Sequence, residues 1–277
     1  SGEDWWCQGY SEPGAGSDLA SLKTKAVREG DDFIINGQKT WTTLGQHANK
    51  IFCLVRTKAD GKPQAGISFI LVDLDTPGIE MRPIRLIEGG HEVNEVFFSD
   101  VRVPAINLVG EENQGWTIAK YLLTHERTNI AGIGFSTQSL EEVKALARTT
   151  LRGGKPLIED PLFAARVAQV EIDLEAMKVT NLRMLFKAQE QGAPGPETSF
   201  LKIKGTTLAQ ELKDLARRAL GPSAAPFPGF ITDGNLALTP PDAANNAAGY
   251  FNHRKTSIFG GSNEIQRNIL TKTILEL

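Results

Sequence analysis

The stretch FIINGQKTWTT, residues 33–43, determines how the first part of the chain is interpreted. Phenylalanine, isoleucine, tryptophan and threonine are all enriched in β-strands. Asn36-Gly37 stands between two strand-like runs, and both residues tolerate the positive φ that a tight hairpin turn needs. The sequence therefore predicts a β-hairpin that turns at Asn36-Gly37.

More strands are expected downstream of this stretch. Short apolar runs separated by turn-rich spacers occur at 51–57 (IFCLVRT), 66–74 (GISFILVDL) and 94–104 (NEVFFSDVRVP). Several short strands at this spacing predict a small β-barrel or sandwich over residues 1–110.

After about residue 111 the hydrophobic period changes to that of helices. Three segments are expected to be largely helical, at 112–150, 162–190 and 197–220. The GAPGP run at 192–196 ends the second of them, and a last helix is expected to start near Asn263. Residues 221–250, rich in Pro, Gly, Ala and Asn, predict a long irregular connection. The expected class is α+β, with a β-domain at 1–110 and a helical bundle at 111–277.

The bulk composition excludes several classes of protein. A net charge of −3 and a pI near 5.9 give no electrostatic reason to expect nucleic acid or an anionic membrane as a partner. The sequence has no run of about 18 apolar residues, so no membrane-spanning helix is predicted. The two cysteines, Cys7 and Cys53, lack metal or redox spacing, which indicates a reducing, cytoplasmic compartment. The four histidines lack metal-ligand spacing, so no metal site is expected.

Glu126 is the candidate acid or base in the helical part. Apolar residues lie three and four positions before it and four after it, at Leu122, Leu123 and Ile130. Burial on that face would raise the pKa of the carboxyl, as a general base near neutrality requires. The alternative is that the face turns only partly inward and Glu126 pairs with Arg127 or Lys120.

Three glycine- or hydroxyl-rich stretches are candidates for binding a planar cofactor. In YSEPGAGSD (10–18), Gly14 and Gly16 leave backbone N–H groups free beside the Ser11 and Ser17 hydroxyls, although such a run is also a common turn. Trp41, Thr42 and Thr43 offer an aromatic ring and two hydroxyls. In SIFGGSNEIQR (257–267), the pair Gly260-Gly261 lets the backbone lie close to a bound molecule.

Together, YSEPGAGSD, INGQKTWTT, VFFSDVRVP and FGGSNEIQR, in this order and spacing, resemble the acyl-CoA dehydrogenases from about residue 8 to the end. The resemblance implies an N-terminal helical domain, a middle β-domain and a C-terminal four-helix-bundle domain. The residues here are similar to the last two only. Because the chain opens on Ser1 rather than Met, it is expected to be a piece of a longer polypeptide.

The resemblance also implies a reaction. A base removes the α-proton of an acyl-CoA thioester while the β-hydride passes to the flavin of FAD, and a trans-2-enoyl-CoA forms. Electrons then pass to an electron-transfer flavoprotein. By the same resemblance Glu126 is the base, because Gly260 occupies the place where many members carry it. Gly260 would donate its N–H to the thioester carbonyl, and Arg127 would lie in the substrate site.

The cofactor residues are likewise implied by the resemblance. Tyr10 and Ser11 would contact the flavin ring, and Trp41 and Thr43 would pack on it and hydrogen-bond to it. The remaining positions are Gly16 in the flavin loop, Ser17 near both cofactor and CoA pyrophosphate, and Ser262 and Glu264 at the flavin nucleotide.

Two departures from the family pattern suggest a partner subunit. Thr150 and Gly153 stand where an Arg and a Phe usually reach the neighbouring subunit's FAD, and residues 218–230 lack the usual Gln-x-x-Gly-Gly-x-Gly segment. The chain thus resembles the large subunits of α2β2 heterotetramers with a homologous small subunit. The alternatives are drift, with Arg148 or Arg152 substituting in a self-tetramer, an acyl-CoA oxidase, or a non-catalytic structural subunit.

Overall fold

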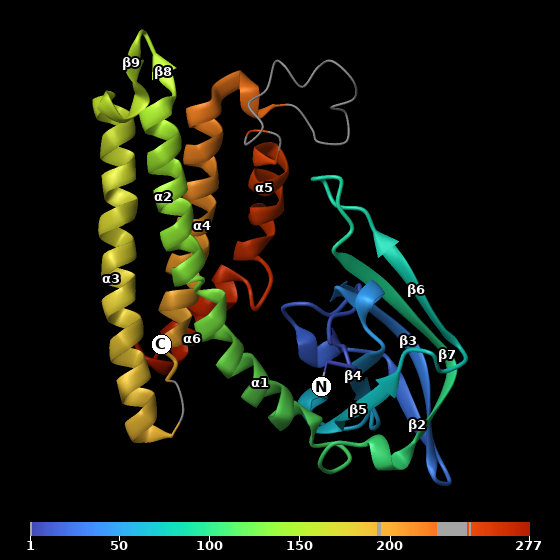
Figure 1. Ribbon diagram of the computed structural model, residues 1–277. Coiled ribbons are helices and arrows are strands. Elements are labelled where there is room, and N and C mark those ends of the chain that lie inside the picture. The colour runs from blue at the N-terminus through green and yellow to red at the C-terminus, as the bar shows by residue number, and fades with distance from the viewer. Residues whose placement is uncertain (1, 193–194, 226–242, 244) are drawn as a thin grey trace, which may run out of the picture. The chain divides into compact units, whose positions relative to one another are not determined.

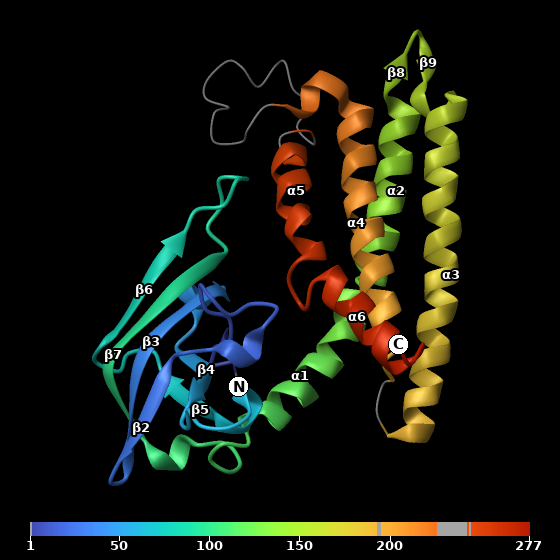
Figure 2. The same ribbon diagram turned by 180° about the vertical axis from the view of Figure 1, so that it is seen from behind.

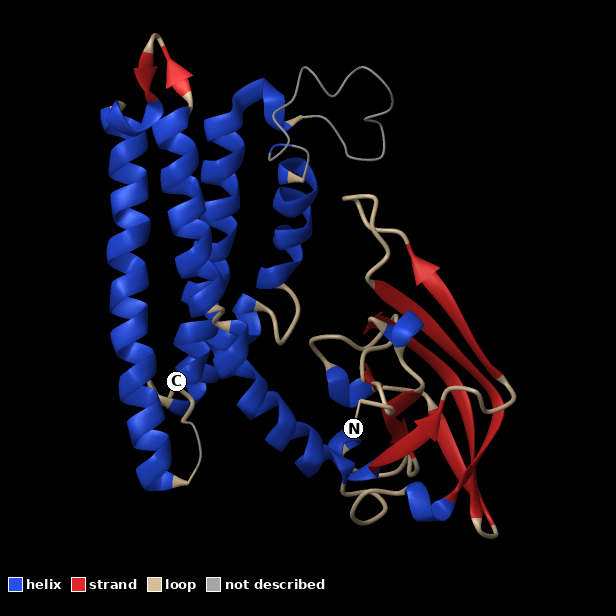
Figure 3. Cartoon of the chain, in the orientation of Figure 1, coloured by secondary structure: helices blue, strands red, loops and turns tan. Residues whose placement is uncertain are grey.

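The computed structural model describes residues 2–192, 195–225, 243 and 245–277, except for the side chains of 124–130 and 191 (Figure 1). The chain divides into two compact units, Ser1–Leu86 with Gly90–Leu122, and Ile87–Gly89 with Leu123–Leu277. The first contains a seven-stranded sheet and the second is mainly helical (Figure 3). The predicted α+β class is confirmed.

One sheet organises the first unit. Its strands are β1 (Trp6–Gly9), β2 (Lys25–Glu29), β3 (Asp32–Thr43), β4 (Lys50–Arg56), β5 (Ile67–Asp73), β6 (Ile79–Ile84) and β7 (Val93–Pro104). Their order is β1-β4-β2-β3-β7-β6, with β5 paired to β4. β4 runs parallel to β1 and β2, and the other pairs are antiparallel. The strands predicted at 51–57, 66–74 and 94–104 correspond to β4, β5 and β7.

The alternation of side chains builds the core of this unit. Phe33 and Ile35 on β3 are fully buried with Ile51, Cys53 and Val55 on β4. The thiols of Cys7 and Cys53 are free, and burial raises their pKa values to about 11 and about 12. Both thiols are therefore protonated near neutrality and serve as apolar packing groups.

The predicted hairpin turn at Asn36-Gly37 is wrong. β3 passes through both residues, and the turn lies at Gly30-Asp31, since Glu29 pairs with Asp32. Asn36 instead lies in a bulge, where the register against β7 shifts. Gly37 has φ 150°, and a Cβ there would lie 2.6 Å from the Thr24 Cα. The glycine is thus required for close backbone approach rather than for a turn.

The second unit is built on three long helices that share one core. Its elements are the end of α1 (Gly115–Ile130), α2 (Ile133–Thr149), the β8–β9 hairpin (Leu151–Arg152 and Lys155–Pro156), α3 (Pro161–Gln191), α4 (Thr198–Leu220), α5 (Asn246–Asn252) and α6 (Asn263–Thr273). α2, α3 and α4 run side by side (Figure 2). Their buried face includes Leu140, Val143, Leu174, Leu208 and Leu212. No described helix is long and apolar enough to cross a membrane.

The segment 112–150 is largely helical, as predicted, but it forms two helices, because α1 ends at Ile130 and α2 begins after Gly132, which has φ 58°. One helical expectation needs correction. Part of the connection expected to be irregular is helical, namely α5, while residues 226–242 and 244 lie outside the described residues. The predicted helices at 162–190, 197–220 and from Asn263 are confirmed as α3, α4 and α6.

Gly205 on α4 fixes the break between α1 and α2. A Cβ at Gly205 would lie 2.3 Å from the Ala131 carbonyl oxygen, whereas a Cβ at Gly134 on α2 would meet nothing within 4 Å. We expect Gly205→Ala to lower the unfolding free energy by about 1–3 kcal/mol, because the clash with backbone exceeds the gain in helix propensity. The control Gly134→Ala should leave stability unchanged or slightly higher in the same urea titration. Equal unfolding free energies for the two variants would contradict the close approach of Gly205 to the Ala131 carbonyl oxygen.

Candidate active site

The loop 10–18 is anchored to β3 through a buried ion pair. Lys39 Nζ donates to Glu12 Oε1 at 2.8 Å and to the Tyr10 carbonyl oxygen at 3.2 Å. The Glu12 carboxylate also accepts from the backbone N–H groups of Lys23 and Thr24, at 2.6 and 2.9 Å. The main chains are joined as well, because the Thr40 N–H donates to the Ser11 carbonyl oxygen at 2.9 Å. The loop conformation therefore depends on this pair.

Burial and charge act in opposite directions on the pair. Burial alone would raise the pKa of Glu12, but the charge of Lys39 and the donated hydrogen bonds hold that pKa below its usual value. Burial lowers the pKa of Lys39, and the Glu12 carboxylate opposes this effect. Lys39 is fully buried, and its ion pair with Glu12 opposes the cost of burying the two groups.

The outer part of the same loop presents free polar groups. Ser11 is half-buried, Gly16 and Ser17 are exposed, and a Cβ at Gly16 would meet nothing within 4 Å. Within the described residues the Ser11 and Ser17 hydroxyls have no hydrogen-bond partner. The loop thus combines a fixed backbone with unused donors, as the binding of phosphate or a ring carbonyl requires.

Trp41 lies on a second bulge of β3, beside this loop. The register against β7 shifts between Lys39 and Thr42, and Trp41 adopts φ 59°, which is uncommon for a bulky residue. Its ring is 58% exposed, and Thr43 is exposed as well. Bulges often re-aim a side chain next to an active site. The structure thus leaves an aromatic ring and a hydroxyl exposed beside the Tyr10-Ser11 backbone.

Tyr10 differs from its neighbours because its side chain is buried. Its ring packs edge-on against Phe52 and Phe69, with centroids 5.8 and 6.3 Å apart. The side chain therefore anchors the loop in the core. Any contact of Tyr10 with a cofactor is left to its backbone.

In the second unit, the Gly260-Gly261 turn precedes α6. Both glycines have positive φ, 64° and 75°, which L-residues with side chains rarely adopt. Gln266 Nε2 donates to both carbonyl oxygens at 3.3 Å, and Ser199 Oγ donates to Gln266 Oε1 at 2.8 Å. Ser262 then caps α6, since its hydroxyl accepts from the Ile265 N–H at 3.3 Å. The turn is thus held in place from α4.

A buried lysine supports the same turn. Lys202 on α4 is fully buried, and its Nζ donates to Asn263 Oδ1 at 2.9 Å, beside Thr206. Burial lowers the pKa of Lys202 to about 8, and the carboxylate of Glu264 partly opposes this shift. The sequence pattern does not indicate this cluster, because it predicts a last helix near Asn263 but not that Asn263 and Gln266 lie on its buried face.

We expect the depressed pKa of Lys202 to appear as pH-dependent stability. Between pH 8 and 10.5 the unfolded chain retains the proton that the folded chain has lost, so the unfolding free energy contributed by this group rises with pH. Relative to Lys202→Met, the wild type should gain about 1 kcal/mol per pH unit in this range. Urea titrations of both proteins at about pH 7.5, 8.5 and 9.5 would measure the difference in unfolding free energy. These values begin below the folded pKa of Lys202 and extend into the range where the effect is expected. If the difference in unfolding free energy between wild type and Lys202→Met did not change with pH, the lowered pKa of Lys202 would be contradicted.

The other predicted residues are placed by the backbone alone or lie at the surface. Glu126 and Arg127 belong to α1, but their side chains lie outside the described residues, so the burial of Glu126 stays a prediction. Glu264 is exposed in the first turn of α6, where a carboxylate is favourable. The structure thus groups Tyr10, Ser11, Gly16, Ser17, Trp41 and Thr43 in the first unit. In the second unit it groups Gly260, Ser262 and Glu264.

The segment with the first family departure is a tight hairpin. Thr150 ends α2, and Gly153 and Gly154 form the turn between β8 and β9. Arg152 Nη2 donates to the carbonyl oxygen of Arg218 in the same chain, at 3.3 Å. That guanidinium is therefore engaged within its own helical unit. Of the second departure, residues 226–230 lie outside the described residues.

Comparisons with known proteins agree with this architecture. The family model for the acyl-CoA dehydrogenase middle domain matches residues 7–101, and that for the C-terminal domain matches residues 113–275. The chain is 39% identical over 276 residues to acyl-CoA dehydrogenase IpdE1 of Mycobacterium tuberculosis, covering 98% of this chain and 66% of that protein. It is 34% identical over 280 residues to a cyclohexane-1-carbonyl-CoA dehydrogenase of Syntrophus aciditrophicus, covering 95% and 66%.

Solved structures of two complexes are also similar. One is the ChsE4-ChsE5 complex from Mycobacterium tuberculosis, with a TM-score of 0.83, 35% identity, and coverage of 99% of this chain and 69% of that chain. The other is the Tcur3481-Tcur3483 steroid ACAD, with a TM-score of 0.86, 31% identity, and coverage of 100% and 69%. The chain spans about two thirds of the length of most of these relatives. With both domain models matched and this identity to curated enzymes, the chain belongs to the acyl-CoA dehydrogenase family.

Proposed function

We propose that this chain provides the flavin-ring side and the catalytic base of an FAD-dependent acyl-CoA dehydrogenase. The observation that carries the proposal is the exposed Trp41 on its bulge, next to the backbone of Tyr10 and Ser11. Trp41 is a large aromatic residue held at positive φ and left more than half exposed. It supports assignment of this surface to a planar aromatic cofactor.

FAD, when bound, supplies the hydride acceptor. Trp41 packs against the ring and Thr43 hydrogen-bonds to it, while the backbone of Tyr10 and the hydroxyl of Ser11 contact its polar edge. Gly16 and Ser17 hold phosphate groups of cofactor or CoA, through N–H and hydroxyl donors. On the second unit, Ser262 and Glu264 contact the nucleotide part.

The proton is moved by groups of the second unit. Glu126 removes the α-proton of the thioester, and the Gly260 N–H donates to the thioester carbonyl oxygen. Such a donor stabilises the negative charge that develops on the oxygen as the proton leaves. Arg127 lies in the substrate site beside the base. Division of the work between a carboxylate and a backbone N–H is a common solution for acidifying a carbon next to a carbonyl.

The proposed substrate is a cyclic acyl-CoA, and the proposed electron acceptor is an electron-transfer flavoprotein. Two of the similar proteins are named for a cyclohexane-1-carbonyl group and for a steroid. Both names refer to a group that contains a ring.

A homologous small subunit is the proposed partner, in an α2β2 assembly. Thr150 and Gly153 remove the groups that would reach a neighbour's FAD, and Arg152 is engaged with Arg218 of its own chain. Two similar structures are complexes of two different chains. Self-tetramerisation is the competing arrangement.

The test uses the full-length gene product, produced with and without a homologous small subunit. Flavin content per chain is measured first, and then bleaching of the flavin absorbance on anaerobic addition of cyclohexane-1-carbonyl-CoA. About one FAD per pair of unlike chains, followed by bleaching, is the expected result. Full flavin content in an assembly of this chain alone would refute the α2β2 arrangement. Absence of bleaching with every acyl-CoA offered would refute the proposed activity.

A further inference from the structure

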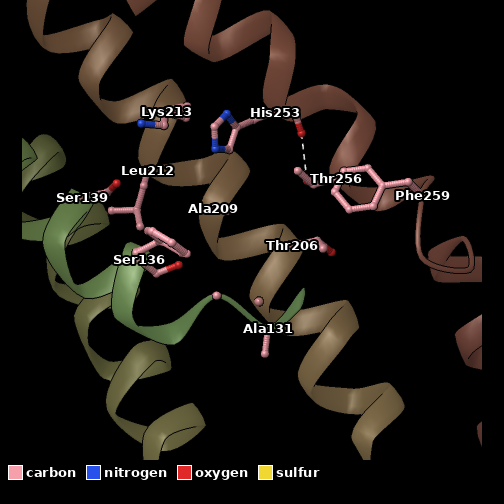
Figure 4. A pocket seen from close by; sticks show the side chains of 13 residues that line it. Ala131, Ser136, Ser139, Thr206, Ala209, Leu212, Lys213, His253, Thr256 and Phe259 are labelled. Carbon is pink, nitrogen blue, oxygen red and sulfur yellow. Dashed lines mark hydrogen bonds between the residues drawn. The ribbon is translucent and has the colours of Figure 1, made fainter. Parts of the chain in front are cut away.

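A pocket of about 200 Å³ lies within the second unit (Figure 4). It is bounded by the start of α2, the middle of α4 and the 3-10 turn His253–Ser257. Its apolar walls include Ala131, Leu212 and the rings of Phe135 and Phe259. Phe135 is 81% exposed, so it forms part of the rim rather than the floor.

The size of the pocket limits what it can hold. Since one water takes about 30 Å³ of liquid volume, the space corresponds to roughly six or seven waters. Sites that enclose drug-sized ligands are larger, at about 300–1,000 Å³. The pocket therefore suits one ring or chain end of a ligand whose remainder lies elsewhere.

One end of the pocket carries two nitrogen groups, Lys213 and His253 (Figure 4). Both lie against Gly249, since a Cβ there would be 4.0 Å from Lys213 Cδ and its carbonyl oxygen is 2.8 Å from His253 Nδ1. A carbonyl oxygen only accepts hydrogen bonds, so Nδ1 carries the proton. Nε2 of the neutral ring is then left as an acceptor.

The imidazole stays neutral near pH 7. Burial lowers the pKa of His253, and the positive charges of Lys213, Arg254 and Lys255 lower it further, although the hydrogen bond to Gly249 opposes this. Its Nε2 therefore presents a lone pair.

Lys213 supplies the matching donor. Within the described residues it has no ion pair or hydrogen bond, because the neighbouring Asp214 is occupied by Arg166, Arg217 and Arg218. The Lys213 side chain is half-buried, and its N–H donors are left for a ligand or water.

A hydroxyl group has the chemistry to pair with both kinds of nitrogen. Its oxygen accepts from the Lys213 ammonium while its hydrogen is donated to His253 Nε2. A C–H group would leave both nitrogens unpaired. The pair therefore favours a ring that carries a hydroxyl over one that does not.

We propose that this pocket receives the ring of the acyl group and that Lys213 and His253 select a hydroxyl on that ring. The inference rests on the proposed function. Phe259, on the rim, is the residue before Gly260, whose N–H is assigned to the thioester carbonyl. The pocket thus begins next to the proposed reacting end of the substrate.

The test compares cyclohexane-1-carbonyl-CoA with its 3-hydroxy and 4-hydroxy derivatives, each isomer separately. Binding to the flavin-loaded full-length protein, with its partner subunit, is measured by calorimetry, and flavin bleaching is followed in parallel. At least one hydroxylated ester should bind about tenfold more tightly than the parent ester. Lys213→Met and His253→Phe should each abolish this preference, so that the hydroxylated and parent esters bind the variant with similar affinity.

Lys204→Met is the matched control, because Lys204 lies on the same helix and pairs with Asp173 at 2.6 Å. It should retain the preference. Equal binding of all esters by the wild type, binding of none, or a hydroxyl preference that persists in both Lys213→Met and His253→Phe would overturn the inference. Bleaching without a hydroxyl preference would refute only this inference. Absence of bleaching with any acyl-CoA would refute the proposed function itself.

Discussion

Replacement of Glu126 by Gln is expected to lower the rate of flavin reduction by an acyl-CoA by about a thousandfold or more. The amide has nearly the size of the carboxyl but cannot accept the α-proton, and general-base catalysis contributes about 10²–10⁴-fold. Anaerobic stopped-flow measurement of flavin bleaching gives this rate directly. Flavin content and substrate affinity should be close to those of the wild type, because the substitution keeps the shape of the side chain.

A matched substitution separates loss of the base from a general effect of charge. Glu175 on α3 pairs with Lys178 at the surface, at 2.6 Å, so Glu175→Gln should bleach at the wild-type rate. Exchange of the substrate α-proton with deuterated solvent provides a second readout, which should be lost in Glu126→Gln alone. Undiminished bleaching by Glu126→Gln would mean that another group removes the proton.

The strand and helix pattern could be predicted because it depends on local periodicity, whereas the exceptions depend on distant residues. β5 and α3 follow their apolar patterns closely. Asn36-Gly37 carries the turn signal, but Thr24 on another strand needs the same glycine for close approach. The break at Gly132 similarly depends on Gly205, which lies on a different helix.

In the candidate site, too, local motifs could be predicted, whereas contacts between distant residues could not. Motif spacing predicted loop 10–18, Trp41 and the Gly260 turn as candidate site positions, but not what holds them in place. Lys39 and Glu12 are 27 positions apart in sequence, and their pairing follows only from the way β3 passes the loop. The cluster of Lys202 with Asn263 likewise joins residues 61 positions apart. Hydrophobic periodicity and motif spacing do not predict such contacts, since none of these residue types is unusual by itself.

Replacement of Lys39 by Met is expected to lower the unfolding free energy of the first unit by about 3–5 kcal/mol. The Glu12 carboxylate would stay buried without its cation, which is the costly way to break a buried pair. This loss is a large fraction of the stability of a typical domain. Because Lys39 also donates to the Tyr10 carbonyl oxygen, retention of FAD should fall in the same variant. Urea titration followed by far-UV circular dichroism measures the stability, and dialysis followed by absorbance measures the flavin.

The pH dependence identifies the buried charge as the cause. In the wild type the folded pKa of Glu12 lies below its unfolded value of 4.5, so its stabilising contribution is complete above that value and is lost as pH falls through the lower folded pKa. In Lys39→Met the sign reverses, because burial without Lys39 raises the folded pKa and protonation relieves the cost. The difference in unfolding free energy between wild type and Lys39→Met should therefore decrease from pH 7 to about pH 4. Glu12→Gln combined with Lys39→Met should recover part of the loss, whereas Lys50→Met, which breaks an exposed pair with Asp73, should change stability little. A gap that stays constant with pH, together with no recovery in the double variant, would show that lost packing rather than an unpaired charge destabilises the loop.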